Sequence, residues 1–521
     1  MNQASRADGL EAPCRVGVDV GGTHTDAVLM RGGEVVSEVK ARTTEDVTSG
    51  VVAALQGVLG GGEAVSDVSR VVIGTTHFTN AVLTGTGLAR VAALRVGLPA
   101  SASLPPFCDW PDGLAGIVRG PVFMVAGGHE CDGRPIVPLD ERAVAAAGKE
   151  IRKAGFDQIA LSAVFAPLDG TAEARAAGIL QDVHPDASIT QSRRLGRIGL
   201  LGRESAGLLN AALRPLAARV TKAFAAAAAA VGTDAPLFIA RNDGTIASAA
   251  AASEFPVLSL SSGPTNSMTG AAFLSGAPAG VVVDVGGTTT DVGYLRAGFP
   301  REAPREVEVG GVRTLFRMPD LLSIALGGGS VVSASGDEVG PQSVGFRLAE
   351  EGLVFGGSAA TATDFGVAAG WATIGDRSRV AGLPAGRVSR FKEVVSARIA
   401  EAVDRMKPDA RDCPLLAVGG GAFLVPAGLE GISETVNVPH AGVANAVGAA
   451  IARIGGEVDK VFHNVGRDEA FRLAAEEAEA RAVAAGADPA GVETVEREDL
   501  PLAYLPGDAR RVRVRVVGEA A

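Results

Sequence analysis

The sequence predicts an α/β protein with two lobes and a small C-terminal tail of helix and strand. The octapeptide DVGGTHTD at 19–26 returns as DVGGTTTD at 284–291, changed only at its sixth position. Each copy follows one short apolar run and leads into another, the pattern of strand, tight turn, strand. A chain of 521 residues also exceeds the ~250 to 300 that one core supports. We therefore expect lobe one over 14–198, lobe two over 199–455 and the tail over 456–521.

Lobe one is expected to alternate strands and helices around its first hairpin. Apolar runs separated by glycine turns predict three antiparallel strands at its start. The stretch 100–140, rich in Pro and Gly, is interpreted as an irregular excursion. In chain order, the predicted elements are strands at 15–18, 26–30 and 34–40, a helix at 45–59, a strand at 70–73, the excursion, a helix at 140–154, a strand at 157–165 and a helix at 170–182.

Lobe two is expected to begin with a long helix from about 201 to 231, followed by a strand at 236–240. Segments 263–272 and 441–450 carry small residues at helical spacing, which lets two helices approach closely. In the tail, a helix over 467–485 and an alternating strand over 511–516 are predicted. We interpret the tail as a cap on lobe two, with a subunit contact as the alternative.

The two hairpins carry residue types that suit phosphate. Adjacent glycines allow the backbone to turn and to point successive N–H groups at an anion, although Gly-Gly after a strand is also a common tight turn. Asp19 and Asp284 lie at the ends of buried strands, where a hydrated Mg²⁺ that keeps most of its waters fits. The expected ligand groups are those of Gly21, Gly22, Thr23 and Thr25 in the first copy and Gly286, Gly287, Thr288, Thr289 and Thr290 in the second.

Composition excludes several other classes of protein. A net charge of −11 without a basic stripe argues against nucleic-acid binding. No apolar stretch reaches the ~18 residues of a membrane span, and the first eleven residues lack the apolar run of a signal peptide. The four scattered cysteines suit reduced thiols and give no zinc-ligand spacing. We expect a cytoplasmic protein that binds neither nucleic acid nor membrane.

The motifs resemble a known superfamily and one family within it. Two such hairpins, followed by a strand running into Gly419-Gly420-Gly421, resemble the actin, Hsp70 and sugar-kinase ATPases, in which the third glycine motif contacts adenosine. The chain is more narrowly similar to the hydantoinase A and 5-oxoprolinase family, in its shorter branch. The matching stretches include 74–80, 127–130, 198–204, 242–244, 262–267, 325–330 and 361–364.

The resemblance implies two actin-like (ribonuclease-H-like) lobes with a nucleotide cleft between them and a hinge at the paired helices. It implies ATP and Mg²⁺ as cofactors, with Asp19 and Asp284 as catalytic and metal residues. Family members use ATP to phosphorylate a lactam or hydantoin carbonyl, which water can then open, and a second hydantoinase-type subunit generally takes part. A small cyclic amide is the expected substrate, and we also consider a homo-oligomer.

Other polar residues are candidates for the substrate pocket. His24, inside the first hairpin, is a candidate catalytic residue that touches substrate or the γ-phosphate; the alternative is that it only fills the position that Thr289 fills in the other copy. His77 and His129 lie in glycine-containing motifs of lobe one, where surface or core histidines are equally common. Asn242, Asp243 and Asp364 belong to polar clusters near glycine turns that could face the cleft.

Three rival functions stay open from the sequence. An acetone-carboxylase-like subunit would phosphorylate a ketone enol, and an ATP-driven reactivase or chaperone would need the same cleft without a carbonyl site. A sugar kinase is disfavoured, because sugar kinases with a Gly-Gly-Thr first hairpin generally lack a second Asp-x-Gly-Gly-Thr-x-Thr-Asp motif. No Ser-His-Asp order or metalloprotease motif indicates a self-contained hydrolase.

Overall fold

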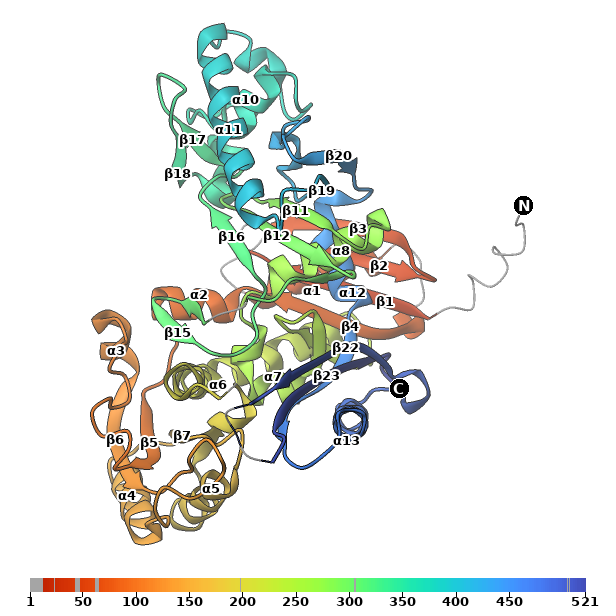
Figure 1. Ribbon diagram of the computed structural model, residues 1–521. Helices are drawn as coiled ribbons and strands as arrows, with labels where there is room; N and C mark the ends of the chain where they lie inside the picture. The colour runs from red at the N-terminus through yellow and green to blue at the C-terminus, as the bar shows by residue number, and fades with distance from the viewer. Residues whose placement is uncertain are drawn as a thin grey trace.

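A computed structural model describes residues 13–22, 24–42, 47–60, 65–196, 198–303, 306–503, 505 and 507–521. Its two largest sheets each contain one of the duplicated hairpins. Figure 1 shows one sheet near the centre of the molecule and the other beside it toward one end, with a smaller unit at the opposite end. Among the described residues, no helix has the length and apolar character needed to cross a membrane.

The first sheet has nine strands, and its hairpin lies near one edge. Val16, Val18 and Val20 occupy alternate positions of the first strand, and all three are buried in one hydrophobic core. Its spatial order is β22 (Glu493–Pro501), β23 (Arg510–Gly518), β21 (Arg453–Phe462), β10 (Thr245–Ser248), β9 (Leu237–Ala240), β4 (Val68–Thr75), β1 (Cys14–Val20), β2 (His24–Arg31) and β3 (Glu34–Arg42). The predicted opening of three antiparallel strands is confirmed.

The second sheet repeats this arrangement around the second hairpin. Val281, Val283 and Val285 pack against Val395 and Ile399 of a long covering helix, α11 (Ala385–Met406). The spatial order is β13 (Phe299–Pro300), β12 (Thr290–Arg296), β11 (Gly280–Val285), β19 (Cys413–Val418) and β20 (Ile432–Asn437), with β16 (Leu321–Ile324) also paired to β12.

Two closely packed helices lie between the sheets. They are α8 (Ser262–Ser275) and α12 (Ala444–Ile451), which contact each other through Gly270 and Gly448. The close approach predicted from small residues at helical spacing is confirmed, and the reading of these helices as a hinge stays a prediction.

The segment between β4 and the long helix α6 (Leu200–Ala230) differs from the prediction. It builds a separate parallel sheet that includes part of the expected irregular excursion over 100–140, because residues 112–126 form a helix and a strand. This third sheet has the order β6 (Arg119–Ala126), β5 (Val91–Leu98), β7 (Gln158–Ala163) and β8 (Ser188–Gln191), and its helices are α3 (Asp112–Val118), α4 (Glu141–Lys153) and α5 (Thr171–Val183).

The C-terminal tail extends the first sheet, so our interpretation of it as a cap on lobe two was wrong. β21 pairs in parallel with β10, and β23 then pairs with β21. Val512, Val514 and Val516 of β23 are buried against α13 (Arg467–Ala484), which confirms the alternating strand. β9 and β10 also lie in this first sheet, although the sequence placed them in lobe two.

A segment of lobe two crosses to the first lobe between β13 and β16. We name residues 301–320 the strap; its described part contains the short strands β14 (Val307–Val309) and β15 (Val312–Thr314). Val309, Val312, Phe316 and Met318 are buried in the core of the first sheet. The remaining regular elements are α1 (Val47–Leu59), α2 (His77–Thr84), α7 (Ala249–Glu254), β17 (Ser330–Val332), β18 (Val339–Ser343), α9 (Leu348–Glu351) and α10 (Ala362–Ala368).

Candidate active site

A cavity of about 400 Å³ lies where the two hairpins face each other. Gly21 and His24 line it from the first hairpin, and Gly286 and Gly287 line it from the second. The predicted third motif, Gly419, Gly420 and Gly421 after β19, lines it as well. The structure therefore brings together three motifs that are far apart in the sequence. Thr23 lies outside the described residues.

The two hairpins have the same local geometry. The Gly21 amide donates to the His24 carbonyl oxygen at 3.0 Å, and the Gly286 amide donates to the Thr289 carbonyl oxygen at 2.9 Å. In each copy the first and last aspartates of the octapeptide are cross-strand partners, Asp19 with Asp26 and Asp284 with Asp291. The repeated sequence therefore places a pair of carboxylates beside each glycine turn.

Asn445 of α12 joins the carboxylates of the first pair. Its Nδ2 donates to Asp19 Oδ2 at 3.0 Å and to Asp26 Oδ2 at 2.9 Å. Lys40 on β3 holds the other oxygen of Asp26, with its Nζ 2.6 Å from Oδ1. Asp19 Oδ1 is buried and accepts no hydrogen bond of normal geometry from the described residues, although the Asn266 side chain is close enough to lower the pKa of Asp19.

The carboxylates are in an environment that disfavours their negative charge. Burial raises the pKa of Asp19 to about 7, and the nearby charges of Asp26 and Asp284 act in the same direction, while the Asn445 hydrogen bond opposes them. Burial also raises the pKa of Asp284, against a hydrogen bond from Ser267. The pKa of Asp291 rises to about 6, mainly through burial. A cation bound at this place would relieve these electrostatic costs.

The donor set fits a hydrated magnesium ion better than a metal held entirely by protein. No group of three or more His, Cys, Asp or Glu side chains among the described residues is arranged to hold a metal ion. Mg²⁺ usually keeps several waters and binds one or two carboxylates together with substrate phosphates. Asp19, whose Oδ1 accepts no hydrogen bond of normal geometry, and Asp284, whose carboxylate lines the cavity, fit that requirement.

Two glycine-rich loops, at 327–329 and 419–421, pack against the second hairpin. The amides of Gly328 and Gly329 donate to the carbonyl oxygens of Gly286 and Gly287 at 3.0 and 2.7 Å. Gly419 has a φ of 87°, and a Cβ there would lie 2.4 Å from Asp284 Oδ1. Only a glycine lets this loop approach the acid so closely.

Several cavity residues were not identified as site residues from the sequence. They include Lys40, Ser267, Gly328, Thr363 and Asn445. Gly328 and Thr363 belong to stretches that carry the family resemblance, so a signal was present. Lys40 stands in a segment without a motif, and Asn445 stands in the segment 441–450, which was noted only for its small residues. Strand register brings Lys40 to the cleft, and helix packing brings Asn445 there.

Asp364, which the sequence placed near the cleft, has a structural role instead. It is buried and forms a capping box with Thr361 at the start of α10. Its Oδ1 accepts a hydrogen bond from the Val354 amide at 2.8 Å, and its Oδ2 accepts from Thr361. The neighbouring Thr363 lines the cavity and donates to the Gly328 carbonyl oxygen at 2.9 Å.

The two histidines proposed for a substrate pocket lie apart from each other, and neither is among the cavity residues. His77 begins α2, where its Nδ1 is 2.6 Å from Thr75 Oγ1, and burial lowers its pKa. His129 is buried beside the third sheet, with its Nε2 3.7 Å from Asp169 Oδ2.

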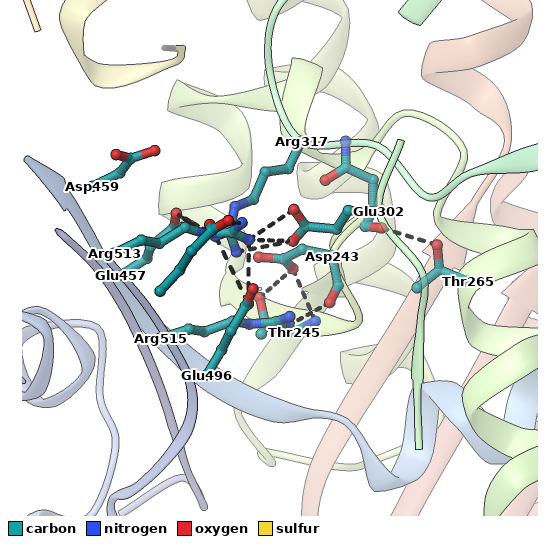
Figure 2. A network of polar contacts seen from close by, with 12 residues as sticks. Asp243, Thr245, Thr265, Glu302, Arg317, Glu457, Asp459, Glu496, Arg513 and Arg515 are labelled. Carbon is teal, nitrogen blue, oxygen red and sulfur yellow. Dashed lines mark hydrogen bonds and ion pairs between the residues drawn. The ribbon is translucent and has the colours of Figure 1, made fainter. Parts of the chain in front are cut away.

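Asn242 and Asp243 line a different cavity, of about 370 Å³. Figure 2 shows Asp243 in a network of arginines and glutamates from the strap and the C-terminal strands. Asp243 Oδ1 accepts hydrogen bonds from the amide and hydroxyl of Thr245, at 3.0 and 2.6 Å. Burial opposes its ionisation, but the positive charges of Arg241 and Arg515 outweigh burial and hold the pKa of Asp243 well below its usual range. The four tentative substrate residues are thus divided among three places.

Comparison with known proteins places these features in a family. A model of the hydantoinase/oxoprolinase N-terminal region matches residues 15–184, and a hydantoinase/oxoprolinase model matches residues 203–373. The alpha subunit of caprolactamase from Pseudomonas jessenii is 26% identical over 387 residues, which cover 68% of this chain and 54% of that protein. The chain thus spans about half the length of this curated relative.

Two solved structures share the fold. The ATP-dependent caprolactamase from Pseudomonas jessenii matches with a TM-score of 0.73 and 20% identity, covering 97% of this chain and 87% of that one. A nucleotide-free acetone carboxylase matches with a TM-score of 0.69 and 17% identity, covering 97% and 88%. The expected fold of two actin-like lobes is confirmed.

Proposed function

Because the chain belongs to the hydantoinase/oxoprolinase family, we propose that it binds ATP between its lobes and uses it to open a cyclic amide. The observation that carries this proposal is the single cavity lined by both Asp-Gly-Gly hairpins and by the third glycine motif. Phosphate is the natural ligand of such paired glycine turns, because their amides and nearby carboxylate-bound cations complement its charge.

The reaction couples two hydrolyses. The lactam carbonyl oxygen takes the γ-phosphoryl group, and ADP leaves. Water then adds to the ring carbon, the C–N bond breaks with a proton going to nitrogen, and a second water releases the phosphate. One lactam, one ATP and two waters give one amino acid, one ADP and one phosphate. The coupling matters because opening an unstrained five-membered lactam is close to neutral in free energy.

The residues around the cavity have separate roles in this proposal. The amides of Gly21, Gly22, Gly286 and Gly287 face the phosphates, and Gly419 to Gly421 face the adenosine. Asp19 and Asp284 hold the hydrated metal, and Asn445 fixes Asp19 relative to Asp26. A bound Mg²⁺ would supply positive charge to the phosphate oxygens. His24, which also lines the cavity, is positioned to touch the phosphate or the carbonyl substrate.

A second subunit is part of the proposal. The curated relative is named as an alpha subunit, which supports a division of labour between two chains. We propose that this chain binds and hydrolyses ATP and that ring opening needs a hydantoinase-type partner. We also propose that both chains act in the cytoplasm. The free state of all four cysteines supports that location.

A second candidate function is phosphorylation of a ketone enol, as an acetone-carboxylase-like subunit. The observation that favours it is the structural match to acetone carboxylase, whose coverage of this chain equals that of caprolactamase. Both functions use the same cleft and differ in the carbonyl compound and in the product.

The test is to mix the purified chain with the partner encoded beside its gene and to supply ATP with hydantoin, 5-oxoproline, caprolactam or acetone plus bicarbonate. The proposal predicts weak ATPase activity alone, and ADP formed in step with ring-opened product when the partner is present. Ring opening without ATP or without the partner would refute the division of labour. ADP coupled only to acetone would favour the carboxylase, and ATPase stimulated by no compound would favour a reactivase.

A further inference from the structure

Each lobe has a row of three side chains that are cross-strand partners on neighbouring strands. The first two residues of the row are aspartates in both lobes, and the third residue differs. In the first sheet, Asp19, Asp26 and Lys40 are successive cross-strand partners on β1, β2 and β3. In the second sheet, Asp284, Asp291 and Ser323 are partners in the same way on β11, β12 and β16. The duplicated acids therefore meet a cation in one lobe and a hydroxyl in the other.

The outer aspartate of each row is bound by the third member. Lys40 Nζ lies 2.6 Å from Asp26 Oδ1, and the Ser323 hydroxyl donates to Asp291 Oδ1. A serine is enough to satisfy one oxygen of a carboxylate at this position. Hydrogen bonding to the acid alone therefore does not require a lysine on β3.

Lys40 also differs from Ser323 in reaching the cleft. It lines the cavity between the hairpins, and Ser323 does not. Among the described residues that line this cavity, Lys40 is the only lysine or arginine. The Lys40 side chain is 38% exposed while that of its partner Asp26 is only 6% exposed, so the ammonium is on the open side of the pair.

The ammonium has unused donors that face a site for anions. A lysine ammonium carries three N–H donors, and Asp26 is the only hydrogen-bond partner recorded for Lys40 within the described residues. The second oxygen of Asp26 accepts a hydrogen bond from Asn445, so the carboxylate that binds Lys40 is itself fixed in position. Charge-assisted hydrogen bonds to phosphate are among the stronger ones in proteins.

We propose that Lys40 is a catalytic residue whose ammonium, held by Asp26, contacts the terminal phosphate of the nucleotide in the cleft. This inference rests on the proposed function, because it requires ATP to bind there. Asp26 is then a positioning residue for Lys40.

The experiment measures binding of ADP and of a non-hydrolysable ATP analogue, each with Mg²⁺, to the full chain by calorimetry. Lys40→Met should lower the affinity for the ATP analogue about 10-fold or more and leave the affinity for ADP unchanged, because only the analogue carries the third phosphate. Lys40→Arg, which keeps a charge at this position, should recover part of the loss. Lys460→Met removes an ammonium paired with Glu477 at 3.3 Å outside the cleft, and should bind both nucleotides like the wild type.

Lys40→Met alone would leave the negative charge of Asp26 without a partner, and that charge could itself repel the nucleotide. The double variant Lys40→Met with Asp26→Asn removes this charge, so any loss of affinity that persists is due to the lost contact between Lys40 and the phosphate. The proposal predicts that the analogue still binds weakly to this variant. Wild-type affinity for the analogue in the double variant, or equal losses for ADP and analogue, would overturn the role of Lys40 while leaving the nucleotide cleft intact. A wild-type chain that binds neither nucleotide would overturn the proposed function and, with it, this inference.

Discussion

Gly448 of α12 lies directly against the backbone carbonyl of Asn266 in α8, and a Cβ at Gly448 would be only 1.9 Å from that oxygen. The two helices that connect the lobes are therefore in backbone contact. The opposite side of the contact is similar, since a Cβ at Gly270 would lie 1.9 Å from the Ala444 carbonyl oxygen. Small residues are required here for packing, because a side chain on either glycine would collide with the backbone of the other helix.

Gly448→Val should force α8 and α12 apart. We expect a loss of stability of at least about 1 to 3 kcal/mol, the range for overpacking a well-packed site, measured by urea denaturation. Small-angle scattering should also show less compaction with an ATP analogue than the wild type shows, if the lobes close at this contact. Gly442→Ala is the control for stability, because nothing lies within 4 Å of a Cβ there. Wild-type stability and compaction in Gly448→Val would contradict the account.

His77→Gln should make the folded protein less sensitive to mild acid. Burial lowers the pKa of His77 in the folded state, whereas the unfolded chain has the ordinary value of about 6.5. The contribution of His77 to the free energy of unfolding is therefore fully present above pH 6.5. It is lost as the pH falls below that value, because the unfolded state gains a proton there before the folded state does. Chemical denaturation of both proteins at pH 7.5 and pH 5.5 checks this. An equal fall in stability for both would show that His77 does not contribute.

Arg513→Met should weaken the attachment of the strap to the C-terminal strands. Arg513 is 8% exposed and lies 2.7 Å from Glu302 of the strap, with Glu496 at 3.2 Å (Figure 2). Its removal leaves Glu302 and Glu496, which are 21% and 37% exposed, with only part of the positive charge that faces them, that of Arg317. We expect a loss of about 1 to 3 kcal/mol in urea denaturation. Arg472→Met, which breaks exposed pairs with Glu469 and Glu476, should cost much less stability than Arg513→Met, because water screens these charges. Similar losses in the two variants would contradict a special role for the buried network.

The local parts of the fold could be predicted from the sequence because the relevant signals are local. The repeated octapeptide predicts two hairpins, and small residues at helical spacing predict the close contact of α8 with α12. The third glycine motif was placed at the cleft through its resemblance to a known superfamily. In each case a few adjacent residues determine the structure.

The missed features depend on contacts between distant segments. Nothing near Lys40 indicates that β3 places it beside Asp26, because that outcome needs the strand register. The tail joined the first sheet because β21 pairs with β10, a pairing that alternation within the tail does not determine. The strap buries Phe316 in the other lobe's core, which no pattern within residues 301–320 predicts. Asn242 and Asp243 stood near a glycine turn, but the turn faces a different cavity.

The measurement that tests the central claim most directly is calorimetric titration of Mg-ATP into the wild type and into Asp19→Ala and Asp284→Ala. Asp409→Ala, which removes an exposed acid that pairs with Arg411 and does not line the cavity, serves as the control. We predict that the wild type and the control bind ATP with a Mg²⁺ dependence that chelation removes. Both cleft variants should remain folded by circular dichroism and lose most of the Mg²⁺-dependent affinity and turnover. Unchanged ATP binding and turnover in both folded cleft variants would contradict the assignment of this cavity as the nucleotide site.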